Sequence, residues 1–116
     1  MKKLFAASVI ALSVCIGTSV MAAQKSVTGT LEDSFCYVTM GAHGPSHKAC
    51  ATACAKKGIP VALVEKGTDK MYILLPPKND TALPADVISK MEDEVTVTGD
   101  EYEKGGITYL TAVSVK

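Results

Sequence analysis

The feature that most restricts the fold is an apolar period of two near both ends of the chain. Apolar and polar residues alternate from Val27 to Leu31, again from Val95 to Gly99, and again after Ile107. Such alternation is typical of strands that bury one face. Because glycine and proline residues interrupt these runs, the sequence predicts a mainly β fold of short strands joined by turns.

Two more strands and a helix are predicted between these outer segments. Residues 61–64 and 71–75 are short apolar runs, and a turn around residues 67–69 joins them into a hairpin. Residues 83–91 have proline in the first turn and apolar residues at helical spacing, which predicts a short amphipathic helix. The first strand, which begins near Val27, is expected to end near Cys36.

A second short helix is predicted from His47 to Lys57. Ser46 precedes it as a candidate N-cap, and Gly58 and Pro60 follow it as stop signals. Alternate alanines in this segment favour a helix, because alanine has the highest helix propensity. The helix therefore stands as an insertion between the first and second strands.

This order of elements resembles the OB-fold, a five-stranded partly open barrel. Residues 95–99 and 105–110 are also similar to the closing hairpin of small exported bacterial OB-like proteins. The resemblance implies a five-stranded OB-like barrel with an extra helix inserted between strands 1 and 2. It implies no particular function, because one fold serves many functions.

The first 22 residues have the pattern of a secretory signal peptide. Lys2 and Lys3 precede the uncharged apolar run Leu4–Ile16, and small residues surround the bond between Ala22 and Ala23. The apolar run is shorter than the roughly 20 residues that a bilayer crossing needs. We therefore expect cleavage near Ala22, a periplasmic or secreted location, and no membrane span in the mature form.

A lipid anchor is disfavoured at Cys15. Lipoprotein signals place a small residue before the modified cysteine, whereas Val14 occupies that position here. Residues 23–116 are then expected to form one domain, since they are too few for two.

The charge of this expected domain argues against nucleic acid as a partner. Every basic residue is lysine, and removing Lys2 and Lys3 from the twelve leaves ten lysines against twelve acidic residues. Phosphate-binding surfaces favour a basic excess and the forked donors of arginine. We expect neither nucleic acid nor a membrane surface to be bound.

All cysteines of the expected domain and both histidines lie within one short segment. These residues, with the methionine among them, are Cys36, Met40, His43, His47, Cys50 and Cys54. On the predicted helix, His47 precedes Cys50 by three positions and Cys54 by seven, so the three share one face. The preceding loop is long enough to fold Cys36 back against them. Three thiols and an imidazole are ligands for zinc and for copper(I), which predicts a metal site at Cys36, His47, Cys50 and Cys54 without choosing the metal.

Three neighbouring residues are additional candidates. His43 lies in a glycine-flanked loop. There it is either a replacement ligand, a residue at the mouth of the site, or a solvated side chain. Met40 is either local packing or a thioether ligand, which would favour copper. Asp33 is a further ligand, a group that orients a ligand histidine, or the residue that ends the first strand.

A disulfide is the alternative use of the cysteines. Cys50 and Cys54 lie one helical turn apart, where Cβ atoms are separated by about 5 to 6 Å, and a relaxed disulfide needs about 3.5 to 4.5 Å. Cys36 has no such obstacle to pairing with Cys50 or Cys54. The alternative function is thus a disulfide-bonded structural or interaction domain, without metal, that binds a small ligand or a protein such as a periplasmic partner.

Catalysis is weakly indicated, and we expect the domain not to be an enzyme. His47 is near enough to Cys50 in sequence to activate a thiol nucleophile. Thioredoxin-like chemistry uses two residues between its cysteines, however, and three separate Cys50 from Cys54. Covalent haem attachment needs histidine directly after the second cysteine, where Ala55 stands.

Overall fold

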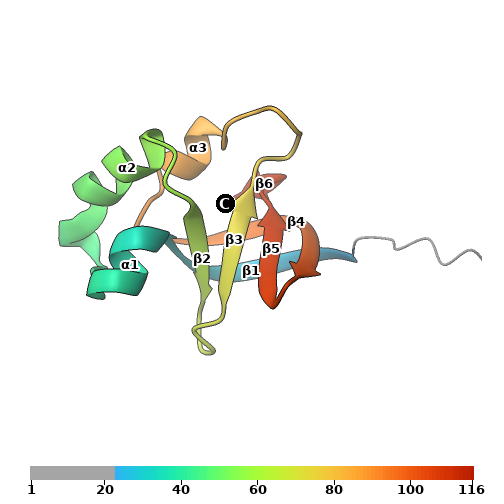
Figure 1. The fold of residues 1–116 in the computed structure, drawn as a ribbon, viewed down its shortest axis with the longest axis horizontal. Coiled ribbons are helices and arrows are strands. Elements are labelled where there is room, and N and C mark those ends of the chain that lie inside the picture. Colours follow the sequence, from blue (N-terminus) through green and yellow to red (C-terminus); the bar gives the residue numbers. More distant parts are fainter. Residues whose placement is uncertain (1–22) are drawn as a thin grey trace, which may run out of the picture.

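A computed structural model of the protein describes residues 23–116, and the predicted signal peptide with Cys15 lies outside them. The described chain is mainly β, as the sequence predicts (Figure 1). Its elements in order are β1 (Ala23–Asp33), α1 (Ser34–Met40), the 3-10 helix η1 (Pro45–His47), α2 (Lys48–Lys56), β2 (Val61–Glu65), β3 (Met71–Leu75), α3 (Ala85–Ile88), β4 (Glu94–Lys104), β5 (Ile107–Thr111) and β6 (Ser114–Val115).

Five strands close into a barrel. They follow one another in the order β1-β2-β3-β5-β4, and β4 pairs again with β1 to complete the ring. The pairing of β3 with β5 is parallel, whereas the other pairings of the ring are antiparallel. This closed mixed sheet is consistent with the predicted OB-like barrel, and the short strand β6 extends it beside β4.

Strand β1 closes the barrel because it pairs on both sides. Residues 23–30 pair with β4, and residues 29–33 pair with β2. Gly29 lies where the two pairings overlap, and a Cβ atom there would clash with the carbonyl oxygen of Val64. The close approach of β1 to β2 at this position therefore requires glycine.

The barrel interior is aliphatic, with one large aromatic residue. Its largest fully buried side chains include those of Tyr72, Leu31, Leu63, Met91 and Leu110. Helix α2 joins this core through Ala51 and Ala55, which are both buried. Each of these alanines follows a cysteine by one position, so packing the alanines against the barrel keeps Cys50 and Cys54 at the flank of the helix.

The insertion between β1 and β2 differs in detail from the sequence prediction. Strand β1 ends at Asp33 rather than near Cys36, and the unpredicted helix α1 follows at once. The carboxylate of Asp33 accepts hydrogen bonds from the backbone N–H groups of Phe35 (3.0 Å) and Cys36 (3.5 Å). This N-cap starts a helix that Gly41, in the left-handed conformation, then ends.

The two predicted helices are present but shorter. The predicted segment 47–57 becomes η1 followed by α2, and Ser46 makes no capping hydrogen bond. The predicted segment 83–91 contains only the four helical residues of α3, which follow Pro84. The part of the chain described here contains no helix that is long and apolar enough to cross a membrane.

Two buried carboxyl groups lie together near the insertion, and one of them attaches it to the rest of the domain. Glu32 of β1 and Glu92, which follows α3, are 4% and 8% exposed. Oε2 of Glu92 accepts a hydrogen bond of 2.8 Å from the backbone N–H of Gly44, in the loop before η1. Burial, and then the hydrogen bond and charge of Glu92, raise the pKa of Glu32 to about 8. Glu32 therefore keeps its proton at neutral pH, which allows two carboxyl groups to lie together in the interior.

Because Glu32 is buried beside Glu92, we expect the free energy of unfolding to fall as the pH rises from about 4.5 to about 8. In that range folded Glu32 holds a proton that the unfolded chain has released, so raising the pH favours unfolding. The measurement is denaturant unfolding across this pH range. Glu32→Gln, which keeps a donor but does not titrate, is expected to flatten the dependence, while Glu103→Gln on the surface leaves it unchanged. An equally steep fall in Glu32→Gln would contradict the assignment.

Candidate metal centre

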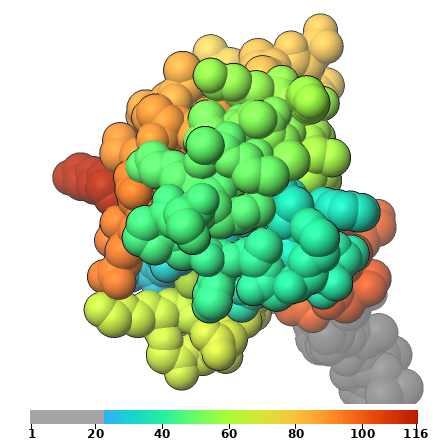
Figure 2. Space-filling model, turned by 90° about the vertical axis from the view of Figure 1, so that its left-hand side faces the viewer, coloured from blue at the N-terminus to red at the C-terminus, as the bar shows by residue number. Residues whose placement is uncertain are grey.

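The insertion brings three elements to one end of the barrel. Figure 2 shows the residues of α1, η1 and α2, coloured from teal to green, gathered on a single face of the molecule. The chain reverses between α1 and η1 through Gly41 and Gly44, which both have positive φ angles (64° and 98°). Glycine adopts this backbone conformation without the steric penalty of a side chain. The reversal places the first turn of α2 opposite α1.

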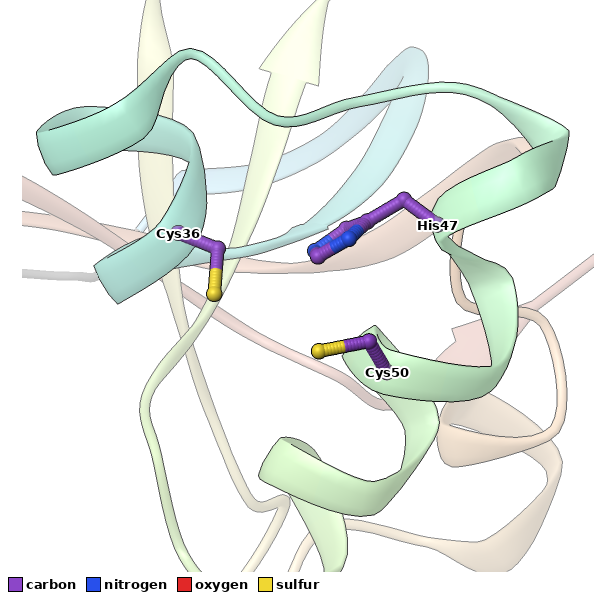
Figure 3. A group of neighbouring side chains, drawn as sticks. All are labelled: Cys36, His47 and Cys50. Atoms are coloured by element: carbon purple, nitrogen blue, oxygen red, sulfur yellow. The ribbon is translucent and has the colours of Figure 1, made fainter.

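One group of possible ligands spans this reversal. The sulfur atoms of Cys36 and Cys50 and a ring nitrogen of His47 all lie within 4.8 Å of one another. In Figure 3, Cys36 extends from α1 while His47 and Cys50 extend from the opposite side toward it. Cys36 is buried, His47 is half-buried and Cys50 is exposed. The group therefore lies at the surface, with its deepest ligand supplied by α1.

His47 carries an unsatisfied polar atom in this group. Its Nε2 is buried and has no hydrogen-bond partner among the described residues. Burying an imidazole nitrogen without a partner is unfavourable, so native structures nearly always satisfy such atoms. A metal ion held by the neighbouring sulfurs would satisfy this nitrogen.

A second group shares Cys36 with the first. It consists of a carboxylate oxygen of Asp33 and the sulfurs of Cys36 and Cys54, again within 4.8 Å of one another. Asp33 is only 1% exposed. Its Oδ1 caps α1, its Oδ2 is buried without a hydrogen-bond partner in the described part of the chain, and the sulfurs of Cys36 and Cys54 lie near the carboxylate. Asp33 thus ends the strand, as one reading of the sequence has it, and also contacts two cysteines.

The carboxylate and the thiols shift one another's pKa values. A hydrogen bond to Asp33, reinforced by burial, raises the pKa of Cys36 to about 12. The same two causes, in the same order, raise the pKa of Cys54. Burial works against ionisation of Asp33, but hydrogen bonds from the thiols of Cys36 and Cys54 and from backbone N–H groups outweigh it and lower the pKa of Asp33. Without a cation, therefore, the site contains one buried carboxylate and protonated thiols.

This arrangement suits a cation that binds sulfur. None of the ion pairs among residues 23–116 includes Asp33, so its buried negative charge has no basic side chain to offset it. Metal binding replaces thiol protons with a positive ion, which stabilises thiolates that the carboxylate otherwise opposes. The donor set of sulfur and imidazole is one that zinc and copper(I) accept.

The four ligands predicted from the sequence meet at one end of the barrel, in two overlapping groups rather than one. Cys36 belongs to both, His47 and Cys50 belong to the first, and Cys54 belongs to the second. The additional candidate His43 is exposed and belongs to neither group, and Met40 is exposed as well. Sequence reasoning missed Glu92, which holds the loop before His47, because its partner Gly44 lies 48 positions away and no local pattern links them.

The thiol positions also bear on the disulfide alternative. Cys36, Cys50 and Cys54 are free thiols, and the sulfur of Cys36 lies within 4.8 Å of both others. Both disulfides considered from the sequence, Cys36–Cys50 and Cys36–Cys54, would therefore join sulfurs that lie near each other. The cluster suits a metal ion when reduced and one disulfide when oxidised.

Comparison with known proteins adds no family to this description. A scan against protein-family models and searches of curated proteins and of solved structures found no significant match. The geometry and chemistry of the site are therefore the basis for assigning a function.

The contact between Asp33 and the thiols predicts the effect of Asp33→Asn. Asparagine still caps a helix but carries no charge, so the thiolate of Cys36 is expected to form at lower pH in the metal-free protein. The measurement is thiolate absorbance against pH in a background with Cys50→Ser and Cys54→Ser. Asp86→Asn, at an exposed position, serves as the control and leaves the titration in place. An unchanged midpoint in Asp33→Asn would show that the carboxylate does not act on Cys36.

Proposed function

We propose that the protein is an exported domain that binds one thiophilic metal ion, zinc or copper(I), and takes part in metal handling. Cys36, His47 and Cys50 are the primary ligands of this proposal, and Cys54 is the fourth. The observation that carries the proposal is a ring nitrogen of His47 grouped with two sulfur atoms, on an imidazole whose buried Nε2 has no hydrogen-bond partner within residues 23–116. Zinc and copper(I) are the common biological ions that this mixture of soft sulfur and imidazole favours.

Cys54 supports a fourth ligand position because it lies close to both other thiols. Its sulfur lies within 4.8 Å of that of Cys36, and Cys50 is near enough to contribute to raising the pKa of Cys54. Zinc takes four such ligands in a tetrahedron. Copper(I), which is softer, is satisfied by the sulfurs and the imidazole of the first group alone. Asp33 is not one of these four ligands. It lies beside them, accepts hydrogen bonds from the thiols and caps α1.

Metal handling is favoured over a purely structural ion by the position of Cys50. This ligand is exposed, whereas Cys36 is buried. An incoming thiolate from a donor or acceptor molecule can reach an ion from the side of Cys50 without unfolding the domain. The barrel core, which is formed by a separate set of aliphatic residues, does not need the ion in order to bury its surface.

The exported location in this proposal rests on the signal-peptide pattern of residues 1–22. A basic start, an uncharged apolar run and small residues before Ala23 support cleavage and release into the periplasm or the medium. A partner that exchanges metal with the domain would then be another periplasmic or secreted protein. Val14 continues to argue against a lipid anchor at Cys15.

A second function is favoured by the mutual closeness of the three thiols. An exported compartment permits a disulfide between Cys36 and either Cys50 or Cys54, which would join α1 to α2 within the insertion without metal. Intact mass measurement of the protein isolated without added metal separates the two functions. Free thiols with one bound ion support the metal-binding domain, and a two-proton mass loss with no ion supports the disulfide-bonded domain.

The histidines provide a matched test of the metal site. His47→Ala is expected to weaken zinc and copper(I) binding by about tenfold or more, because it removes a ligand. His43→Ala removes the same side chain from an exposed loop position outside the ligand groups and is expected to leave the affinity unchanged. The measurement is competition with a chromophoric chelator, with circular dichroism to verify folding.

Equal affinities of His47→Ala and the unchanged protein would contradict the ligand set. Equal losses in the His43 and His47 variants would do the same, because they would show that the loop rather than a ligand had been disturbed.

A further inference from the structure

The three thiols of the metal centre differ in their access to solvent. Cys36 is 5% exposed, Cys54 is half-buried and Cys50 is exposed. Thiol-disulfide exchange begins when a thiol and a disulfide of another molecule come into contact, so access selects the sulfur that reacts first. A small disulfide in solution meets Cys50 before it meets either neighbour.

The second step is also selected by position. A mixed disulfide on Cys50 is resolved by a thiol that attacks the Cys50 sulfur, and the sulfurs of Cys36 and Cys54 are both nearby. Cys54 lies one turn along α2 from Cys50, where Cβ atoms are about 5 to 6 Å apart. That separation exceeds the about 3.5 to 4.5 Å of a relaxed disulfide. Cys36 is on a different helix, across the chain reversal, so a small approach of α1 to α2 closes the bond without unwinding either helix.

We propose that the centre is redox-regulated: Cys36 and Cys50 form a reversible disulfide by exchange with a small external disulfide, and this bond expels the metal ion. The inference rests on the proposed metal binding and adds the condition under which the ion is released. The inference is based on the sulfur of Cys36, which belongs to both ligand groups. This sulfur lies beside the exposed sulfur of Cys50 on the opposite helix.

The reaction balances with glutathione disulfide as the oxidant. The Cys50 thiolate attacks one sulfur of glutathione disulfide, which forms a mixed disulfide and releases one glutathione thiolate. The Cys36 sulfur, which is a thiolate while it binds the ion, then attacks the Cys50 sulfur, which forms the Cys36–Cys50 bond and releases the second glutathione thiolate. In the metal-free form the proton of Cys36 leaves with that glutathione as its thiol. Two cysteine sulfurs are oxidised, two glutathione sulfurs are reduced, and the metal ion leaves with its charge unchanged.

Loss of the ion follows from the loss of two ligands. A disulfide sulfur is a poor metal ligand compared with a thiolate, so the bond removes Cys36 and Cys50 from the donor set together. The remaining donors are His47 and Cys54, and the two ligand groups no longer have a sulfur in common. Reduction of the bond restores the thiols and therefore the site.

The experiment uses the reduced protein, first titrated with zinc and then treated with glutathione disulfide without oxygen. Zinc is chosen because it does not itself change oxidation state. A metal-sensitive dye follows release, thiol counting follows oxidation, and peptide fragmentation identifies the linked cysteines. We expect one zinc ion to be released for every two thiols lost, a link between Cys36 and Cys50, and recovery of zinc binding after reduction with dithiothreitol.

Two serine variants serve as a matched pair, each examined in the metal-free form so that altered affinity does not intervene. Cys54→Ser, which keeps both Cys36 and Cys50, is expected still to form the Cys36–Cys50 bond. Cys50→Ser is expected to lose its thiols about tenfold more slowly or worse, because the accessible sulfur is gone.

Three results would overturn the inference: a link other than Cys36–Cys50, equal rates in the two variants, or zinc that stays bound after two thiols are lost. Zinc uptake by the reduced protein is measured before the oxidant is added. If the reduced protein takes up no zinc, the proposed metal binding itself is refuted and not only its regulation.

Discussion

The buried carboxylate of Asp33 determines where the candidate site lies. Its Oδ1 ends β1 by capping α1, so the chain leaves the barrel as a helix and Cys36 points into the insertion rather than along the sheet. Its other oxygen is buried without a hydrogen-bond partner among the described residues, and the carboxylate lies near the thiols of Cys36 and Cys54 without a basic side chain to offset its charge. Such a group is unfavourable in an interior unless a proton donor or a cation stabilises it. The same residue therefore builds the site and gives it an affinity for positive charge.

The barrel contributes a rigid support for this site. Closure between β1 and β4 fixes the strand that carries Asp33, and the buried alanines of α2 fix the helix that carries Cys50 and Cys54. Glu92, which lies beside the buried Glu32, holds the loop between α1 and η1 through the N–H of Gly44. A domain of this kind keeps its ligands near one another before any ion is present, which lowers the entropy that binding has to offset. A disulfide between Cys36 and Cys50 would regulate metal binding by joining two of these preorganised ligands.

Much of the fold follows from the sequence because the strands have a clear period of two and the turns contain glycine or proline. The order of strands, the insertion and the helix before β4 were all predictable in this way. Helix α1 was not, since seven residues rich in β-branched and aromatic types give no helical signal and the decisive N-cap bond involves Asp33, which also suits a strand end. The clustering of cysteine and histidine predicted which residues meet. It did not predict two groups that share Cys36, because the chain reversal at Gly41 and Gly44 sets that geometry.

The central claim is that His47 and the cysteine sulfurs bind one ion together. X-ray absorption spectroscopy of the protein loaded with one equivalent of zinc or copper(I) measures the ligands of that ion directly. The account predicts a first shell of sulfur together with one imidazole nitrogen, with zinc–sulfur distances of about 2.3 Å and a zinc–nitrogen distance of about 2.0 to 2.1 Å. A shell made of oxygen and nitrogen without sulfur, or of sulfur without imidazole, would contradict it.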